Sequence, residues 1–330
     1  MVDFTVAIPT YNGEHRLPEV LDRLKAQLAT EPFSWEVMVV DNNSSDGTAA
    51  VVHRYQTDWL PNCPLKYIKE TRQGAAFARQ RAIEESDSEF VGFLDDDNIP
   101  ATDWVAAAFT FGKTHPAAGA FGSQIHGDFE VSPPKNFKKI ALFLAIVERG
   151  SKPYIYTPEK KLLPPGAGLV VRRQVWLETV PAQLVLNNAG KDAGLASEDL
   201  EVGLYIQNAG WEIWYNPDMH VHHKIPKWRL EKDYLLSLFR CIGLSSHHIR
   251  MLRFKAWQRP FAFLIYLLND LRKLTLHILK HGRVIKDDLI AACEQELLIS
   301  TLISPFFLWK KRFLSPAKQV SPVINSVNRA

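Results

Sequence analysis

Three consecutive carboxylates, Asp95, Asp96 and Asp97, stand directly after an apolar run at residues 90–94. Adjacent carboxylates repel one another, so their clustering is unfavourable unless a cation lies between them. Hard divalent ions such as Mg²⁺ and Mn²⁺ take oxygen ligands and bind through one or two carboxylates together with substrate phosphates. On an extended segment Asp95 and Asp97 point to the same side, so one can hold the metal while the other contacts a ribose or base. The alternative, a solvated acidic turn, is disfavoured by the preceding apolar run.

A second carboxylate pair, Glu198 and Asp199, stands about 100 residues downstream, at the start of an amphipathic pattern. One of these carboxylates could act as a general base that deprotonates an acceptor hydroxyl. The alternative is structural, with Ser197 as a helix N-cap and the acidic residues favoured by the helix dipole.

Three histidines, His220, His222 and His223, follow Pro217. Strand alternation places His220 and His222 on one face and His223 on the other. A lone histidine is usually structural, but a cluster near a candidate metal site favours metal or pyrophosphate binding by one of them.

Polar and cationic residues follow two further apolar runs. Asp41, at the tip of the run at residues 36–40, can accept a hydrogen bond from a base or ribose, while the residues after it suit a turn. Arg72 and Arg79 supply positive charge, and an arginine fork suits the phosphate oxygens of a nucleoside diphosphate. Arg79 could instead be a solvated residue on a helix surface.

The elements that must position these groups alternate between apolar runs and helical patterns. Predicted strands cover residues 4–8, 36–40, 65–69, 90–94 and 118–123, and predicted helices cover 16–28, 48–55, 75–84 and 102–115. This alternation predicts an α/β fold with a doubly wound, mainly parallel sheet. Ligands of such sheets bind beyond the carboxyl ends of the strands, and polar clusters follow four consecutive strands here. We therefore expect these four strand ends to face one cleft.

The pattern changes after residue 125. Residues 126–165 predict a loop with one apolar helix near residues 140–147, and residues 166–223 are again compact, with an edge strand at residues 210–217. From about residue 230 the chain is basic, helical and apolar.

Charge is unevenly distributed. The net charge of +3 is the sum of −9 over residues 1–223 and +12 over residues 224–330. Apolar stripes rimmed by Lys, Arg and Trp suit helices that lie in an anionic membrane interface, and the alternative is a helical cap with solvated basic faces. No uninterrupted apolar run reaches the roughly 20 residues that span a bilayer.

Cysteine usage and the N-terminus indicate the compartment. The three cysteines are far apart and lack metal-ligand spacing, and the first residues show no signal-peptide pattern. A reducing cytosolic setting is therefore expected.

In order and spacing, these residues resemble family 2 glycosyltransferases with the GT-A fold over about residues 4–223. The matching motifs are Pro9-Thr10-Tyr11-Asn12, Val40 to Thr48, Gly74 to Gln80, Asp95 to Asp97, Gly166 to Arg173, Glu198-Asp199, and His223 after Pro217. Gln80 departs from the pattern, in which asparagine occupies this position. Among members, the sequence is most similar to cyanobacterial hormogonium polysaccharide glycosyltransferases.

The resemblance implies an inverting, metal-dependent transfer of a sugar from a nucleoside-diphosphate donor, expected to be a UDP-sugar, to a glycan or lipid-linked acceptor in cell-surface or extracellular polysaccharide synthesis. It implies that Asp97 and His223 hold Mn²⁺ or Mg²⁺ and that Asp199, with Glu198, provides the base. The implied donor-binding residues are Pro9, Tyr11, Asn12, Asp41, Arg72, Gly74, Arg79, Asp95 and Asp96. The implied acceptor-side residues are Gly166, Gly168 and Trp211.

The resemblance also implies a domain division. A GT-A catalytic domain would cover residues 1–225, with a nucleotide-sugar-binding half at 1–125 and an acceptor half at 126–225. A helical, basic C-terminal region would cover residues 226–330. With an anionic membrane as partner, the protein would be cytoplasmic and peripheral on the inner face of the plasma membrane.

Three other functions fit these residues less well. A nucleotidyltransferase would need a Gly-rich, Lys- or Arg-bearing loop after the first strand, which residues 9–13 lack. A non-catalytic nucleotide-sugar-binding subunit of a polysaccharide assembly complex could dispense with Asp199, which is present here. Nucleic acid is not an expected partner, because an acidic cleft is unsuited to a phosphate backbone.

Overall fold

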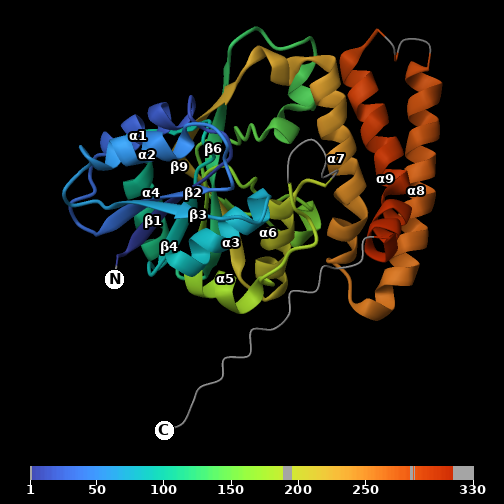
Figure 1. Cartoon of the computed structure of the whole chain (residues 1–330). Helices are drawn as coiled ribbons and strands as arrows, with labels where there is room; N and C mark the ends of the chain where they lie inside the picture. The colour runs from blue at the N-terminus through green and yellow to red at the C-terminus, as the bar shows by residue number, and fades with distance from the viewer. Residues whose placement is uncertain (1, 189–194, 283–284, 286, 315–330) are drawn as a thin grey trace.

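The computed structural model describes residues 2–188, 195–282, 285 and 287–314. Within these residues a nine-stranded sheet has the order β3-β2-β1-β4-β8-β6-β9-β5, with β7 paired to β9 (Figure 1). The strands are β1 (Phe4–Thr10), β2 (Trp35–Asp41), β3 (Leu65–Lys69), β4 (Phe90–Phe93), β5 (Asn98–Pro100), β6 (Ala118–Phe129), β7 (Tyr154–Ile155), β8 (Leu169–Arg172) and β9 (Glu212–Ile225).

The first half of the chain builds the parallel part of this sheet, as predicted. β1 pairs in parallel with both β2 and β4, and β2 pairs in parallel with β3. Side chains along β2 are buried throughout, because helices cover a parallel sheet and such strands are therefore continuously apolar. The helices of this half are α1 (Leu17–Lys25), α2 (Thr48–Gln56), α3 (Ala75–Glu85) and α4 (Trp104–Thr114).

The second half makes the sheet mixed. β8 inserts between β4 and β6 and is antiparallel to both. The predicted edge strand at residues 210–217 is wrong, because β9 lies inside the sheet, parallel to β6 and antiparallel to β5 and β7. Pro217 is accommodated by an irregularity in the pairing with β6, between the Gly122–Tyr215 and Gln124–His220 partners, where a proline does not interrupt the ladder.

Shorter elements connect these strands. The helix predicted near residues 140–147 is replaced by two 3₁₀ turns, η1 (Phe137–Lys139) and η2 (Ala141–Leu144), and η3 (Pro158–Lys160) follows. The apolar residues that suggested a helix pack against the C-terminal helices, and Ala145 ends η2 with a left-handed backbone. The remaining helices here are α5 (Arg173–Thr179) and α6 (Glu198–Asn208).

The C-terminal region forms a helical layer beside the sheet (Figure 1). It contains η4 (Lys227–Leu230), α7 (Lys232–Met251), η5 (Ala256–Gln258), α8 (Arg259–His281) and α9 (Leu289–Leu314). α7 packs along α9, and Leu235, Phe239 and Cys293 belong to a second hydrophobic core there. Arg250 of α7 forms an ion pair with Asp270 of α8.

One helix in the described part of the chain, α9, is long and apolar enough over Leu289–Lys311 to cross a membrane by length and composition. Within its most apolar stretch 39% of the residues are buried against protein. Pro305 does not break this helix, so the apolar segment is longer than the sequence alone suggested.

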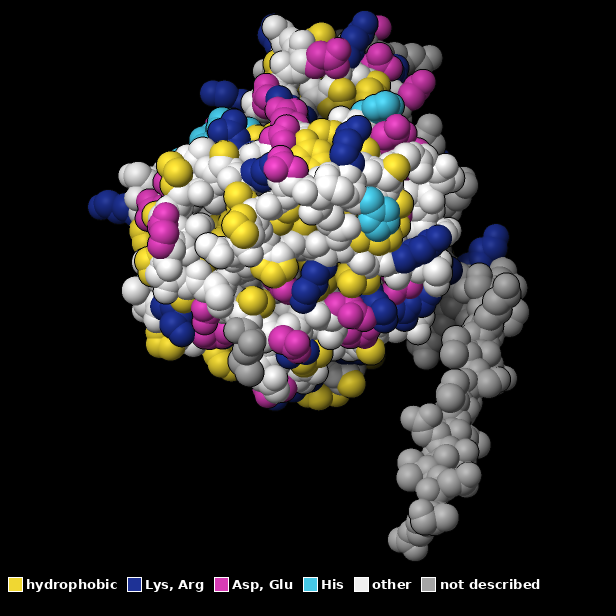
Figure 2. Space-filling model, turned by 60° about the vertical axis from the view of Figure 1, so that its left-hand side comes forward, with side chains coloured by type: hydrophobic (Ala, Val, Ile, Leu, Met, Phe, Trp, Pro, Cys, Tyr) yellow, Lys and Arg dark blue, Asp and Glu magenta, His cyan; other side chains and the backbone are white. Residues whose placement is uncertain are grey.

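The uneven distribution of charge along the sequence does not make every face of the protein wholly positive or wholly negative. On the face shown in Figure 2, Lys and Arg side chains lie among Asp and Glu side chains and apolar groups. Opposite charges at such short spacing screen one another, so this face offers no continuous electrostatic footprint for a polyanion.

Candidate active site

A cleft of about 730 Å³ opens where the parallel strands end. It is lined by residues that follow β1 and β4, by the start of α3 and α6, and by η2, η4 and α7. The predicted residues that line it are Pro9, Tyr11, Arg79, Asp95, Asp96, Asp97, Gly166, Glu198, Asp199 and His223. The two carboxylate clusters that the sequence singled out therefore face one space.

Arg79 joins the two clusters. Its guanidinium donates from one terminal nitrogen to Asp95 at 3.1 Å and from the other to Glu198 at 2.9 Å, with 8% of the side chain exposed. Burial opposes its charge, but Asp95 and Glu198 outweigh burial and raise the pKa of Arg79. Burial raises the pKa of Glu198 above its ordinary value; Arg79 pulls that pKa down, and Asp199 adds to the rise. The alternative of a solvated Arg79 is thus wrong.

Asp97 and His223 lie together, as the metal prediction requires. The His223 Nε2 atom is 3.7 Å from an oxygen of Asp97, and both side chains are 9% exposed. His223 Nδ1 lies 2.9 Å from the Leu144 carbonyl oxygen and must donate to it, which leaves Nε2 with a lone pair. Burial opposes ionisation of Asp97, but His223 and Arg229 hold the pKa of its carboxyl well below the usual range.

Arg229, on η4, is a site residue that the sequence analysis missed. It donates to Asp97 at 2.7 Å and to the His223 Nε2 atom at 2.8 Å. Its Nε atom, like that of Arg79, is among the described buried polar atoms without a hydrogen-bond partner. Both arginines line the cleft, and each directs terminal N–H groups to carboxylates there. The only sequence signal for Arg229 was its place in the basic run after His223.

Asp96 has a structural role that the prediction did not assign. One oxygen accepts from Arg16 Nε at 2.7 Å, and the other accepts from Arg16 at 2.9 Å and from the Thr10 hydroxyl at 2.6 Å. Both Asp96 oxygens therefore accept hydrogen bonds from within the protein. These bonds connect the segment after β4 to the end of β1 and the segment that follows it, and they leave no unpartnered carboxylate oxygen for the sugar nucleotide.

Four predicted donor-binding residues do not line the cleft. Asp41 is buried and accepts from the Ser44 N–H at 2.8 Å and from the Tyr67 hydroxyl at 2.6 Å. Asn12 accepts from the Ser45 N–H at 2.9 Å. These contacts fix the loops after β1 and β2, and burial with the Asp41 contact raises the pKa of Tyr67 to about 12.

The other two stand after β3. Arg72 forms an ion pair with Glu70 and stacks over Phe77, which turns its charge away from the cleft. Gly74 has a φ of 131°, which glycine adopts without strain, and its N–H donates to the Asn42 side chain at 2.6 Å. Asn42 lines the cleft and was not predicted.

The acceptor-side predictions divide. Gly166 lines the cleft and donates its N–H to Asp199 at 2.7 Å, and a β-carbon there would come within 2.5 Å of the Arg79 guanidinium. Gly168 does not line the cleft. Its φ of +65° and its close approach to Ser123 require glycine at this position. Trp211 packs against Gly119, beside the Ala118–Glu212 pair where β6 and β9 begin. It does not line the cleft, so the structure does not support its assignment to the acceptor side.

Two further expectations are settled by the geometry. His220 and His222 pack around His126 on the other face of β9, so of the three histidines His223 alone reaches the cleft. Ser197 precedes α6 with a left-handed backbone, and its side chain makes no capping hydrogen bond, so the N-cap interpretation fails.

A mixed, mainly parallel sheet of this order, with carboxylates at its strand ends, is the GT-A fold. Residues 5–170, half of the chain, match the profile described as "Glycosyl transferase family 2". The chain belongs to this family.

Similar proteins differ in how much of the chain they cover. The uncharacterized glycosyltransferase YfnE of Bacillus subtilis is 38% identical over 104 residues, which are 31% of this chain and 25% of YfnE. The glucosyl-dolichyl phosphate glucuronosyltransferase of Haloferax volcanii is 25% identical over 281 residues, covering 82% of this chain and 86% of that protein. The alignment with YfnE thus spans about a quarter of that relative's length.

One solved structure supports the fold directly. The mannosyltransferase PcManGT of Pyrobaculum calidifontis, determined in complex with GDP-Man and Mn²⁺, superposes with a TM-score of 0.59. The superposition covers 94% of this chain and 90% of PcManGT at 21% sequence identity. The likeness therefore extends beyond the family match, into the second half of the sheet and the C-terminal helices.

Proposed function

We propose that this protein is a metal-dependent, inverting glycosyltransferase, and that it moves a sugar from a nucleoside-diphosphate donor to a hydroxyl of a lipid-linked or glycan acceptor in cell-surface polysaccharide synthesis. The observation that carries the proposal is the cleft itself, in which Arg79 joins a donor cluster around Asp95 and Asp97 to an acceptor cluster around Glu198 and Asp199. Residues 1–225 would form the body of the catalytic domain, and residues 226–330 a membrane-directed region that also brings Arg229 and α7 to the cleft.

The residues around Asp97 fit a divalent cation. A buried carboxylate and an imidazole whose Nε2 lone pair accepts from Arg229 are suitable ligands once the Arg229 guanidinium moves aside. We assign Asp97 and His223 as the protein ligands of Mn²⁺ or Mg²⁺. The ion would neutralise charge on the departing diphosphate. PcManGT, solved with GDP-Man and Mn²⁺, supports this assignment by analogy of fold.

Arg229 would then have two partners in turn. When no sugar nucleotide is bound, the Arg229 guanidinium neutralises Asp97. When a metal ion is bound at Asp97, it repels the guanidinium, which then pairs with the diphosphate of the sugar nucleotide. The terminal N–H groups of Arg229, which donate to Asp97 and His223 in the absence of a cation, would make that contact. Arg229 and Arg79 therefore place positive charge where the leaving group develops negative charge.

Asp199 is assigned as the general base. Its two oxygens accept from the Gly166 N–H at 2.7 Å and from the Leu200 N–H at 2.8 Å, which fix the carboxylate at the cleft wall. It would take the proton of the acceptor hydroxyl while that oxygen bonds to the anomeric carbon. The bond from this carbon to the diphosphate oxygen breaks, and its electron pair leaves with the nucleoside diphosphate. A single displacement of this kind inverts the anomeric configuration and needs no covalent intermediate.

Part of the cleft wall is apolar. This part includes Leu142 and Phe143 of η2, Leu162, and Leu238 and Ile242 of α7. Apolar walls of this kind suit the hydrocarbon of a lipid carrier better than a hydrated polysaccharide. The Haloferax volcanii relative is a glucosyl-dolichyl phosphate glucuronosyltransferase, and this name supports a lipid-linked acceptor here.

The outer face of α8 suits an anionic membrane. Exposed apolar side chains recur at helical spacing along it, at Phe261, Leu264, Ile265 and Leu268. Exposed basic residues on and just before the helix are Lys255, Arg259, Arg272, Lys273 and Lys280. Apolar residues with a basic rim bind the interface of bilayers that contain anionic lipid, which would place the enzyme peripherally on the inner face of the plasma membrane.

The double substitution Ile265→Asp and Leu268→Asp is expected to reduce binding to phosphatidylglycerol vesicles at least ~10-fold, because each buried apolar side chain contributes about 1.5–3 kcal/mol. Both side chains are exposed, so the fold should be retained. Vesicle flotation at low salt measures the effect, with Leu28→Asp as a matched exposed control on the catalytic domain. Equal flotation of the wild type and the double variant would refute the assignment of α8.

The function itself is tested by donor turnover. The protein is incubated with Mn²⁺ and a panel of UDP-, GDP- and dTDP-sugars, and release of the nucleoside diphosphate is measured. We expect turnover of one nucleotide class, with UDP-sugars favoured. Binding of a sugar nucleotide without turnover of any donor, with lipid-linked acceptors present, would instead indicate the non-catalytic subunit.

A further inference from the structure

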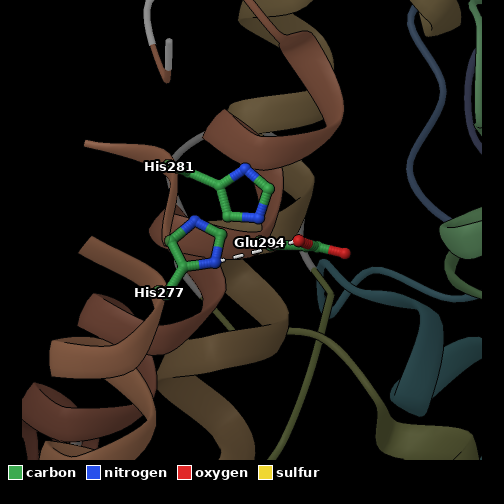
Figure 3. A group of neighbouring side chains, drawn as sticks. All are labelled: His277, His281 and Glu294. Atoms are coloured by element: carbon green, nitrogen blue, oxygen red, sulfur yellow. Dashed lines mark ion pairs between the residues drawn. The ribbon is translucent and has the colours of Figure 1, made fainter. Parts of the chain in front are cut away.

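A group of metal-ligating side chains lies between α8 and α9, on residues that do not line the catalytic cleft. His277 and His281 are one helical turn apart on α8, and Glu294 faces them from α9 (Figure 3). Each of the three offers one ligand atom, and these atoms all lie within 4.8 Å of one another. In Figure 3 both imidazole rings turn a nitrogen towards the Glu294 carboxylate.

The hydrogen bond of His277 defines which of its nitrogens is free. Its Nε2 atom lies 3.0 Å from the Ala291 carbonyl oxygen, which can only accept, so Nε2 carries the proton. The Nδ1 lone pair of the neutral ring then points at the Glu294 carboxylate, 3.8 Å away. A lone pair and a carboxylate that face each other need a proton or a cation between them. Metal-bound histidines are commonly oriented in this way, with the second ring N–H on a backbone carbonyl.

We propose that His277, His281 and Glu294 form a binding site for a transition-metal ion, preferentially Zn²⁺, that clamps α8 to α9. Two imidazoles and one carboxylate suit Zn²⁺ better than Mn²⁺ or Mg²⁺, which prefer oxygen ligands. Three protein ligands leave the fourth tetrahedral position to water. The site is therefore distinct in chemistry, as well as in place, from the one at Asp97.

The required movement is small. Ligand bonds of about 2.0–2.1 Å in a tetrahedral site separate ligand atoms by roughly 3.3 Å. The His277–Glu294 distance of 3.8 Å would thus shorten by roughly half an ångström, and the other separations, which are within 4.8 Å, by at most about 1.5 Å. His277 is buried and anchored, whereas His281 and Glu294 are partly exposed and can adjust.

A clamp at this position has a structural consequence. Arg250 holds the middle of α8 through Asp270, and the histidine cluster lies near the C-terminal end of the same helix. Between and beyond these points the outer face of α8 is apolar and exposed. A metal ion would therefore fix the orientation of this outer face relative to α9 and the catalytic domain.

The test uses the full chain, stripped of metal and titrated with Zn²⁺. We expect one Zn²⁺ per chain at this site, a rise of the Tm, and a Co²⁺-substituted form with the visible absorption of a four-coordinate ion. His281→Asn and Glu294→Gln should weaken Zn²⁺ binding at least ~10-fold and abolish the Tm rise. Neither change removes the His277–Ala291 hydrogen bond, so the metal-free proteins should remain folded.

Two controls separate this site from other histidines and from the catalytic cation. His53→Asn, at an exposed histidine on α2, should leave Zn²⁺ binding unchanged. Asp97→Asn should also retain it. Zn²⁺ binding that survives both His281→Asn and Glu294→Gln, or that is lost in Asp97→Asn alone, would overturn the proposal. Either result leaves the donor-turnover test of the proposed function unaffected.

Discussion

Replacement of Asp199 by asparagine is expected to lower kcat for sugar transfer by about 10²–10⁴-fold, the usual contribution of a general base. Asparagine keeps the shape of the side chain and one acceptor for the Gly166 N–H, but it cannot take the proton of the acceptor hydroxyl. The Kd of the donor nucleotide should change little, because Asp199 belongs to the acceptor side of the cleft. Steady-state transfer rates and nucleotide titrations measure the two quantities.

The matched control for this change is Asp58→Asn. The Asp58 side chain is 96% exposed and lies outside the cleft, so the same loss of charge there should leave kcat unchanged. Wild-type turnover by a folded Asp199→Asn protein would show that the base has been misassigned. Glu198 would then be the remaining carboxylate on that side, and burial, which raises its pKa, would favour proton uptake despite its ion pair with Arg79.

Replacement of Asp97 by asparagine is expected to raise the Mn²⁺ concentration for half-maximal turnover by at least ~100-fold. The substitution removes the buried carboxylate that we assign as the metal ligand and leaves His223 alone. It also deprives Arg229 of its ion-pair partner, while the guanidinium still donates to the His223 Nε2 atom, the one remaining ligand. A titration of turnover against Mn²⁺, at saturating donor, measures the effect.

Arg229→Gln provides a contrast with Asp97→Asn. It removes a cation that occupies both proposed metal ligands, so Mn²⁺ should bind more tightly while kcat falls because the leaving diphosphate loses a positive charge. Opposite shifts of Mn²⁺ affinity in the two variants are expected. The same weakening in both would mean that Arg229 supports the metal site rather than competing for it.

Local patterns explain why so much of the fold was predictable. Strands β1 to β4 and the helices between them are short and strongly periodic, these strands are neighbours in the sheet, and their parallel order follows from the alternation. Asp95 and Asp97 were identified because strand ends in such sheets converge on one cleft, whereas Asp199 and His223 were identified through the family resemblance. The structure brings all four to its wall.

The errors concern contacts between distant segments. Asp41 and Asp96 were expected to contact the ligand, but they bind Tyr67 and Arg16 and so fix loops. No sequence motif marked Tyr67 or Arg16 as their partners. Arg229 reaches Asp97 only because β9 and η4 return beside β5.

Strand position was equally hard to predict from local sequence. The sequence near Trp211 gave no sign of which end of β9 would face the cleft, because β9 is long and lies between partners that come from three separate parts of the chain. Side-chain pairing across such distances depends on tertiary packing rather than on local pattern.

The central claim is that this enzyme turns over a sugar nucleotide only with a divalent cation at Asp97. Its most direct test is the rate of nucleoside-diphosphate release by the wild-type protein in EDTA and after Mn²⁺ is restored in excess. We predict loss of turnover in EDTA and recovery with Mn²⁺, with little recovery in Asp97→Asn. Undiminished turnover by the wild type in EDTA would contradict the account.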